Sequence, residues 1–134
     1  MRYIGIVLVL ALFTLNSCKK EDIMDKFVPE VLYFKNDRVE NADFKETTLA
    51  PGISSWTLKA RVSAPAKLKE IKLYRDNGGG EALVETYTDF LLSPTVYTIN
   101  YLVEDISSAT VMKIVATDMD GKATARNFNI SVSP

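Results

Sequence analysis

The chain of 134 residues carries 16 basic and 17 acidic side chains, and it contains one cysteine and no histidine. This length suits one domain. The nearly balanced charge excludes binding of nucleic acid through a strongly basic face, so we predict no nucleic-acid partner. The missing histidine excludes Ser-His-Asp and Cys-His catalysis and the usual zinc sites, and a lone cysteine excludes an internal disulfide.

The N-terminal segment has the layout of a secretory signal. Arg2 supplies the positive start, the residues from Ile4 to Leu15 form an apolar run, and the small residue Ser17 precedes Cys18. The alternatives are an ordinary secreted form and an uncleaved membrane anchor, but a run of about 12 residues is shorter than the roughly 20 that cross a bilayer. We therefore predict a signal peptide over residues 1–17.

The residues Leu15-Asn16-Ser17-Cys18 resemble the lipobox of bacterial lipoproteins, in which the cysteine is lipidated and begins the mature chain. The resemblance implies a lipid on Cys18 that anchors the protein to the membrane, since each buried acyl methylene contributes about 0.8 kcal/mol. The following Lys20-Glu21-Asp22 is similar to the export signal of Bacteroidetes-type surface lipoproteins. It implies a lipid-anchored protein of the outer membrane that is exposed at the cell surface. If these residues are only a solvated tether, a periplasm-facing location is the alternative.

The rest of the chain predicts an all-β domain. Residues 18–29 are the lipidated cysteine and a charged tether, and residues 30–134 alternate between apolar and polar positions without a helical stripe. The alternation is clearest after Trp56, where Leu58, Ala60 and Val62 share its face. Strands are predicted, in chain order, over residues 31–35, 56–64, 68–75, 82–88, 95–103, 110–117 and 122–132, with a short further edge strand over 44–48.

About seven strands at this spacing are typical of a β-sandwich. The last two, Ile114-Val115-Ala116-Thr117-Asp118-Met119-Asp120-Gly121-Lys122 and Phe128-Asn129-Ile130-Ser131-Val132, resemble the closing hairpin of Ig-like bacterial domains of the PKD, cadherin-like and fibronectin type III groups. The resemblance implies an Ig-like β-sandwich of antiparallel strands, without the cysteine pair of antibody domains.

A pair of carboxylates is the catalytic arrangement that remains without histidine, as in glycoside hydrolysis. Glu81 and Glu85 are close in sequence, but on a predicted edge strand they are expected to be solvated. Since no base or nucleophile arrangement is visible elsewhere, we predict that the protein is not an enzyme and needs no cofactor.

The sequence Asp118-Met119-Asp120-Gly121 is similar in spacing to the start of a calcium loop. An EF-hand loop needs an acidic residue at its twelfth position, which is Asn129 here. We therefore predict a tight turn and no metal site. A cadherin-like calcium site shared with Glu104 and Asp105 is the alternative.

Aromatic side chains are the best candidates for ligand binding. Trp56, Tyr97 and Tyr101 share the inward phase of their strands and are predicted to be core residues. Tyr74 and Tyr87 are out of phase with their apolar neighbours and flank the glycine-rich turn at residues 78–80. We single them out as the candidate pair for ligand binding, exposed on one sheet face, where a sugar is a suitable ligand. The alternative is two amphipathic tyrosines that only cover a sheet surface.

The two resemblances imply an accessory role at the cell envelope. We predict a lipoprotein that acts as a non-catalytic binding or interaction module, with a part in surface glycan capture. Its partners would be the membrane, through the lipid, and a glycan or an envelope protein. The alternative function is a structural spacer or a protein-docking subunit that works through a sheet edge.

Overall fold

The computed structural model describes residues 27–36, 39–90 and 92–134, and every regular element in these ranges is a β-strand. The predicted signal peptide, Cys18 and Lys20-Glu21-Asp22 lie outside the described residues. No helix in the described ranges is long and apolar enough to cross a membrane. The strands are β1 (Glu30–Asn36), β2 (Val39–Glu40), β3 (Glu46–Leu49), β4 (Trp56–Ser63), β5 (Leu68–Asp76), β6 (Glu81–Tyr87), β7 (Val96–Val103), β8 (Thr110–Asp118) and β9 (Ala123–Val132).

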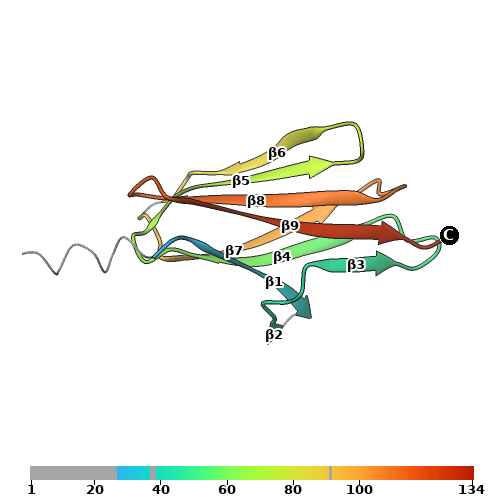
Figure 1. The fold of residues 1–134 in the computed structure, drawn as a ribbon, viewed down its shortest axis with the longest axis horizontal. Helices are drawn as coiled ribbons and strands as arrows, with labels where there is room; N and C mark the ends of the chain where they lie inside the picture. Colours follow the sequence, from blue (N-terminus) through green and yellow to red (C-terminus); the bar gives the residue numbers. More distant parts are fainter. Residues whose placement is uncertain (1–26, 37–38, 91) are drawn as a thin grey trace, which may run out of the picture.

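The strands form two stacked sheets, so the predicted all-β sandwich is confirmed (Figure 1). The first sheet has the order β2-β1-β4-β7, and the second has the order β3-β9-β8-β5-β6. All neighbours are antiparallel except β3 and β9, which run parallel. The parallel pair arises because the chain crosses from the first sheet to the edge of the second before it reverses direction at β4.

Most predicted strands are present, with ends that differ by one or two residues. The prediction was incomplete between β1 and β4, where β2 was missed and β3 begins two residues later than expected. Both are short strands at sheet edges. β2 is held in place by backbone pairing with β1, and β3 by backbone pairing with β9. Backbone pairing does not require alternation of apolar and polar residues, so these strands leave no clear alternating pattern in the sequence.

The core lies between the sheets and comes from alternate positions of the long strands. On β4 the predicted inward residues Leu58, Ala60 and Val62 are buried, while Trp56 is half-buried. β8 lies between β9 and β5, and its residues from Thr110 to Asp118 alternate between buried and half-buried positions. Full burial of an aliphatic side chain contributes about 1.5–3 kcal/mol, so this layer supplies most of the stabilisation.

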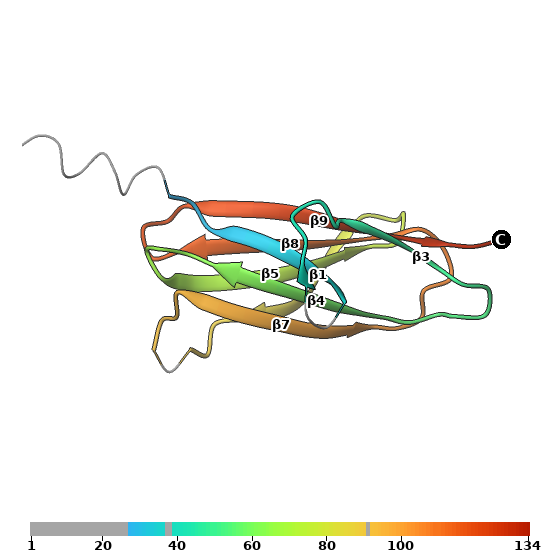
Figure 2. The ribbon, with the colours of Figure 1, turned by 90° about the horizontal axis from the view of Figure 1, so that it is seen from below.

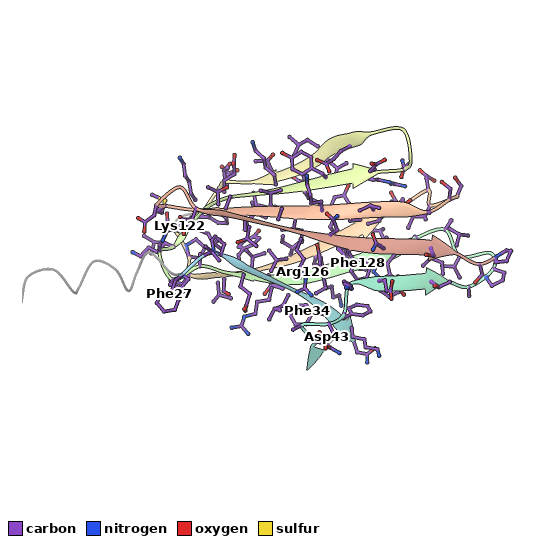
Figure 3. The ribbon with its side chains drawn as sticks, in the orientation of Figure 1. Phe27, Phe34, Asp43, Lys122, Arg126 and Phe128 are labelled. Carbon is purple, nitrogen blue, oxygen red and sulfur yellow. The ribbon has the colours of Figure 1, made fainter. Side chains whose placement is uncertain are left out.

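The sandwich is elongated, and its ends carry different loops (Figure 2). Phe27, the first described residue, lies at one end, and the C-terminus lies at the other (Figures 1 and 3). We call these the Phe27 end and the Pro134 end. The turns after β4, β6 and β8 lie at the Phe27 end, and those after β3, β5 and β7 lie at the Pro134 end. Within the predicted tether, Pro29 is already buried, so packing begins before the first strand.

Along one side of the sandwich the edges of β1 and β9 lie close together without pairing. Two side chains tie these edges to each other. The Tyr33 hydroxyl donates to the Arg126 carbonyl at 2.5 Å, and the Arg126 guanidinium donates to the Val31 carbonyl at 2.6 Å and to the Ala42 carbonyl (Figure 3). The guanidinium also lies 5.5 Å from the centre of the Tyr33 ring. Side-chain hydrogen bonds to backbone carbonyls therefore connect β1, β9 and the segment after β2 along this side of the sandwich.

Candidate functional site

Tyr74, the first residue of the predicted tyrosine pair, lies on the outer face of the second sheet. Its ring is covered by Lys113, whose Nζ lies 4.9 Å from the ring centre. The same Nζ is 2.6 Å from Oε1 of Glu81. Tyr74 is therefore half-buried beneath a cation that is itself paired, and its covered face is not open for stacking with a ligand.

A β-bulge in β6 separates the two predicted site residues. Tyr74 pairs with Leu83, but the next residue of β5, Leu73, pairs with Glu85, so Val84 is an extra residue on β6. Because side chains alternate between the two faces of a sheet, one extra residue moves the rest of β6 to the opposite face.

Tyr87 consequently faces into the sandwich. It pairs with the buried Ile71, and its ring centre lies 5.6 Å from that of Tyr97 on the facing sheet. Burial, with a smaller effect of the Glu85 charge, raises the pKa of the Tyr87 hydroxyl to about 12. Tyr74 and Tyr87 therefore do not share an exposed face, and the structure does not bring them together as a binding pair.

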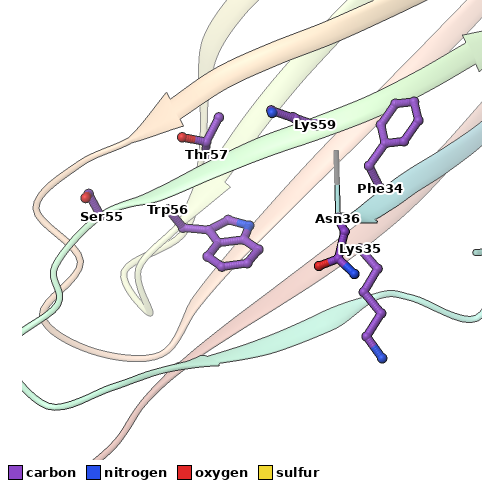
Figure 4. A pocket seen from close by; sticks show the side chains of 7 residues that line it. All are labelled: Phe34, Lys35, Asn36, Ser55, Trp56, Thr57 and Lys59. Carbon is purple, nitrogen blue, oxygen red and sulfur yellow. The ribbon is translucent and has the colours of Figure 1, made fainter. Parts of the chain in front are cut away.

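A groove does open in the first sheet, where β1 and β4 separate. The two strands pair from Glu30 opposite Ser63 to Tyr33 opposite Ala60, and the described residues of β1 beyond Tyr33 do not continue this pairing. The resulting groove is open to solvent and has a volume of about 480 Å³ (Figure 4). Its walls are two aromatic rings, two lysines and three small polar side chains: Phe34, Trp56, Lys35, Lys59, Asn36, Ser55 and Thr57.

The groove combines a fixed aromatic base with polar groups. The Trp56 indole is stacked on Phe128 with a centroid separation of 6.3 Å and an interplanar angle of 12°, so core packing holds it in place. Figure 4 shows Trp56 and Asn36 directed into the gap between β4 and β1. Aromatic surface with a few convergent polar groups is typical of small-molecule sites of this volume. The arrangement suits a ligand that has both an apolar face and hydroxyl groups, as a sugar ring has.

The sequence prediction placed Trp56 in the core and did not identify the groove. Trp56 does pack against the core, but it also lines the groove. The apolar run that ends at Phe34 was a signal for this groove in the sequence, because it places apolar side chains on both faces of β1. In the sheet, β1 has a long neighbour, β4, on one side and only the short β2 on the other. An aromatic residue that faces outward from such a strand indicates a surface for binding a ligand or a partner.

The predicted turn after β8 is confirmed, and its acidic residues have a structural task. Oδ1 of the buried Asp118 accepts hydrogen bonds from the backbone amides of Asp120 at 3.0 Å and Lys122 at 2.9 Å. Gly121 has a φ of 84°, which the turn requires and which glycine adopts without strain. Over the described ranges, no group of three or more His, Cys, Asp or Glu side chains lies close enough together to hold a metal ion.

No protein-family model and no curated protein matches the chain. Among solved structures, a variant of superoxide reductase (neelaredoxin) from Ignicoccus hospitalis is similar with a TM-score of 0.53 and 10% identity, covering 84% of this chain and 87% of that chain. Superoxide reductase (neelaredoxin) from the same organism has a TM-score of 0.51 and 11% identity, covering 85% and 89%. The PmoD soluble domain from a Methylocystis species has a TM-score of 0.39 and 12% identity, covering 81% and 93%, and is too dissimilar to carry an argument.

These neighbours correct the prediction that the chain is not an enzyme. The superoxide reductases that share its fold are enzymes, so a small all-β domain of this kind does host catalysis. The prediction was wrong because it treated the missing histidine and nucleophile arrangements as decisive for the whole class. At 10% and 11% identity the likeness extends to the fold alone.

Proposed function

We propose that the protein is a lipoprotein of the bacterial cell envelope, of the Bacteroidetes type, whose Ig-like domain binds a glycan at the cell surface. The lipid anchor on Cys18 rests on the lipobox-like residues before it, and the surface location rests on Lys20-Glu21-Asp22. The periplasm-facing orientation is the alternative location. The lipid anchor and the surface location are both implied by the resemblance of these short motifs to lipoprotein signals.

The order of the strands supports the Ig-like part of the proposal. In the Ig fold, strands A, B and E are neighbours in one sheet, and strands C, F and G are neighbours in the other. Here β1, β4 and β7 occupy the first set of places, and β5, β8 and β9 occupy the second. The chain also changes sheet between β4 and β5 and again on either side of β7, as a Greek-key sandwich requires.

The groove between β1 and β4 is the observation that carries the binding function. Trp56 offers apolar surface with the Asn36 amide beside it, and Phe34 adds a second ring from β1. Ser55 and Thr57 line the groove, which has a volume of about 480 Å³, from the opposite face of β4. Phe34 lies well away from Phe27 along the molecule (Figure 3). A lipid attached before residue 27 would therefore leave the groove accessible to large ligands outside the membrane.

A docking function is the second candidate, and the outer face of β7 favours it. Val96 and Leu102 are 45% and 51% exposed on this edge strand. Exposed apolar side chains beside an unpaired strand edge are suited to contact with another envelope protein. In that case the domain is a spacer or a subunit of an envelope complex.

A polysaccharide-retention assay with the full chain tests the glycan proposal. The variant Phe34→Ala/Asn36→Ala removes one aromatic and one polar group of the groove, and Trp56 is left intact because Phe128 packs against it. We expect retention on one polysaccharide to weaken about tenfold in this variant.

The matched control is Val96→Ala/Thr98→Ala, which removes an apolar and a polar side chain from the exposed face of β7, opposite Ser63 and Arg61 and away from the groove lining. It should retain the glycan as the unaltered chain does. Equal retention by both variants would show that the groove is not the site. If no polysaccharide retains the unaltered chain, the glycan function is wrong and docking through β7 is favoured.

A further inference from the structure

A second, smaller cavity lies on the side of the sandwich where the edge strands β6 and β7 face each other. It has a volume of about 220 Å³ and lies beside the end of β6 and the start of β7. We call it the seam pocket. Its lining comes from the end of β6, the connection and the start of β7: Glu85, Thr86, Tyr87, Thr88, Asp89, Phe90 and Tyr97.

Three aromatic rings from these three segments converge at the pocket. The Tyr97 ring centre lies 5.6 Å from that of Tyr87 and 5.1 Å from that of Phe90. The interplanar angles are 53° and 69°, so the rings are inclined to one another and do not form a flat stack. Aromatic faces carry negative electrostatic potential, which attracts a cation placed over them.

Two carboxylates add negative charge at the same place. Glu85 and Asp89 line the pocket, no lysine or arginine is among its described lining residues, and neither carboxylate forms an ion pair with another described residue. Glu85 and Tyr87 line the same pocket, and burial, followed by the charge of Glu85, raises the pKa of the Tyr87 hydroxyl.

The β-bulge at Val84 is what assembles this group. Without the extra residue, Glu85 and Tyr87 would stay on the outer face with Leu83, and the pocket would lose one ring and one charge. Bulges on edge strands commonly redirect side chains beside functional sites. The same feature that separates Tyr87 from Tyr74 therefore places it opposite Tyr97 and beside Glu85.

We propose that the seam pocket binds an organic ammonium group carried on a short aliphatic stem. The three rings supply the cation–π surface, and Glu85 and Asp89 supply the opposite charge. The volume is below the 300–1,000 Å³ that is typical of sites for drug-sized ligands, so the pocket accepts a head group or one side chain. This site is separate from the groove at Trp56 and does not depend on glycan binding there.

NMR titration of the full chain, with the tyrosine rings isotopically labelled, tests the proposal. Choline represents a quaternary head group, n-butylammonium represents a lysine side chain, and 3,3-dimethylbutan-1-ol is the uncharged analogue of choline. We expect the Tyr87 and Tyr97 ring signals to shift with one or both cations and not with the alcohol. The cation that binds with the higher affinity shows whether the pocket takes a quaternary head group or a lysine side chain.

Glu85→Gln should weaken this binding about fivefold, because it removes one opposite charge and little volume. Glu104→Gln is the matched control, since it makes the same change at an exposed residue at the Pro134 end. This variant should bind the cation with the affinity of the unaltered chain. If both variants weakened cation binding equally, the binding would be due to the overall negative charge of the protein and not to the pocket, and the proposal would be wrong. Equal shifts with choline and the alcohol, or no shift with either cation, would also overturn it.

Discussion

Burial controls the ionisation of two tyrosines that the fold turns inward. Tyr33 is fully buried, and the loss of solvent raises the pKa of its hydroxyl well above the ordinary value. Tyr87 is only half-buried at the β6–β7 side, and its pKa is raised to about 12, first by burial and then by Glu85. A tyrosine hydroxyl is neutral at physiological pH even without such a shift, and the raised pKa of Tyr33 keeps its proton available for the hydrogen bond to the Arg126 carbonyl in alkaline solution as well.

The raised pKa of Tyr87 predicts a loss of stability in alkaline solution. An unfolded tyrosine ionises near pH 10, whereas Tyr87 in the folded chain ionises near pH 12. Its neutral form therefore contributes in full below pH 10, and the contribution is lost as the pH rises from 10 to 12. Over that range we expect the free energy of unfolding to fall more steeply for the unaltered chain than for Tyr87→Phe.

Denaturant unfolding of the two proteins at several pH values measures this difference directly. The comparison removes the contribution of the lysines, because both proteins contain the same ones. Parallel curves between pH 10 and 12 would mean that Tyr87 ionises as freely in the folded chain as in the unfolded one, and that its ring is not held inward.

At the scale of elements, the side of the sandwich formed by β1 and β9 depends on one arginine. Arg126 donates to the carbonyls of Val31 and Ala42, which belong to segments far from β9 in the sequence. A planar guanidinium can reach two acceptors at once, and a lysine ammonium cannot do so with the same geometry. The contact between β1 and β9 therefore depends on the shape of this side chain as well as on its charge.

Replacing Arg126 should destabilise the fold through these carbonyls. We expect Arg126→Ala to lower the free energy of unfolding by about 2 kcal/mol, since it removes two charge-assisted hydrogen bonds and a contact with the Tyr33 ring. Arg126→Lys should recover less than half of that loss. Thermal and denaturant unfolding measure both variants. Full recovery by lysine would assign the effect to charge alone.

The whole molecule has its described N-terminal end and its C-terminus at opposite ends of the sandwich, as Figures 1 and 2 show. A lipid attached near residue 18 would therefore hold the Phe27 end towards the membrane and direct the loops of the Pro134 end away from it. The groove and the exposed face of β7 would both remain accessible in this orientation.

The proposed lipid anchor on Cys18 predicts the outcome of one substitution. Cys18→Ala should abolish incorporation of labelled fatty acid and leave the precursor unprocessed, because the thiol is the site of lipid attachment in the lipobox reading. Metabolic labelling followed by electrophoresis measures both effects. Normal processing of the variant would reject the lipobox, whereas Ser131→Ala, far from the predicted cleavage site, should be processed as the unaltered chain is.

The sequence by itself determined the class of fold and most of its strands. Residues such as Leu58, Ala60 and Val62 alternate with polar neighbours, and burying one face of a strand requires that alternation. The turn at Asp118 was also predictable, because its side chain bonds to amides within four residues of itself. In each case the cause of the structure lies within a short stretch of chain.

Only the tertiary structure decided where the candidate sites lie. The bulge at Val84 depends on how β6 is paired with β5, and its sequence carries no mark of the extra residue that turns Tyr87 inward. The groove beside Trp56 depends on the separation of β1 from β4, two strands that are distant in the chain. Alternation records which face of a strand is buried, but register and separation are set by partners elsewhere in the sequence, and so they appear only when the sheets are formed.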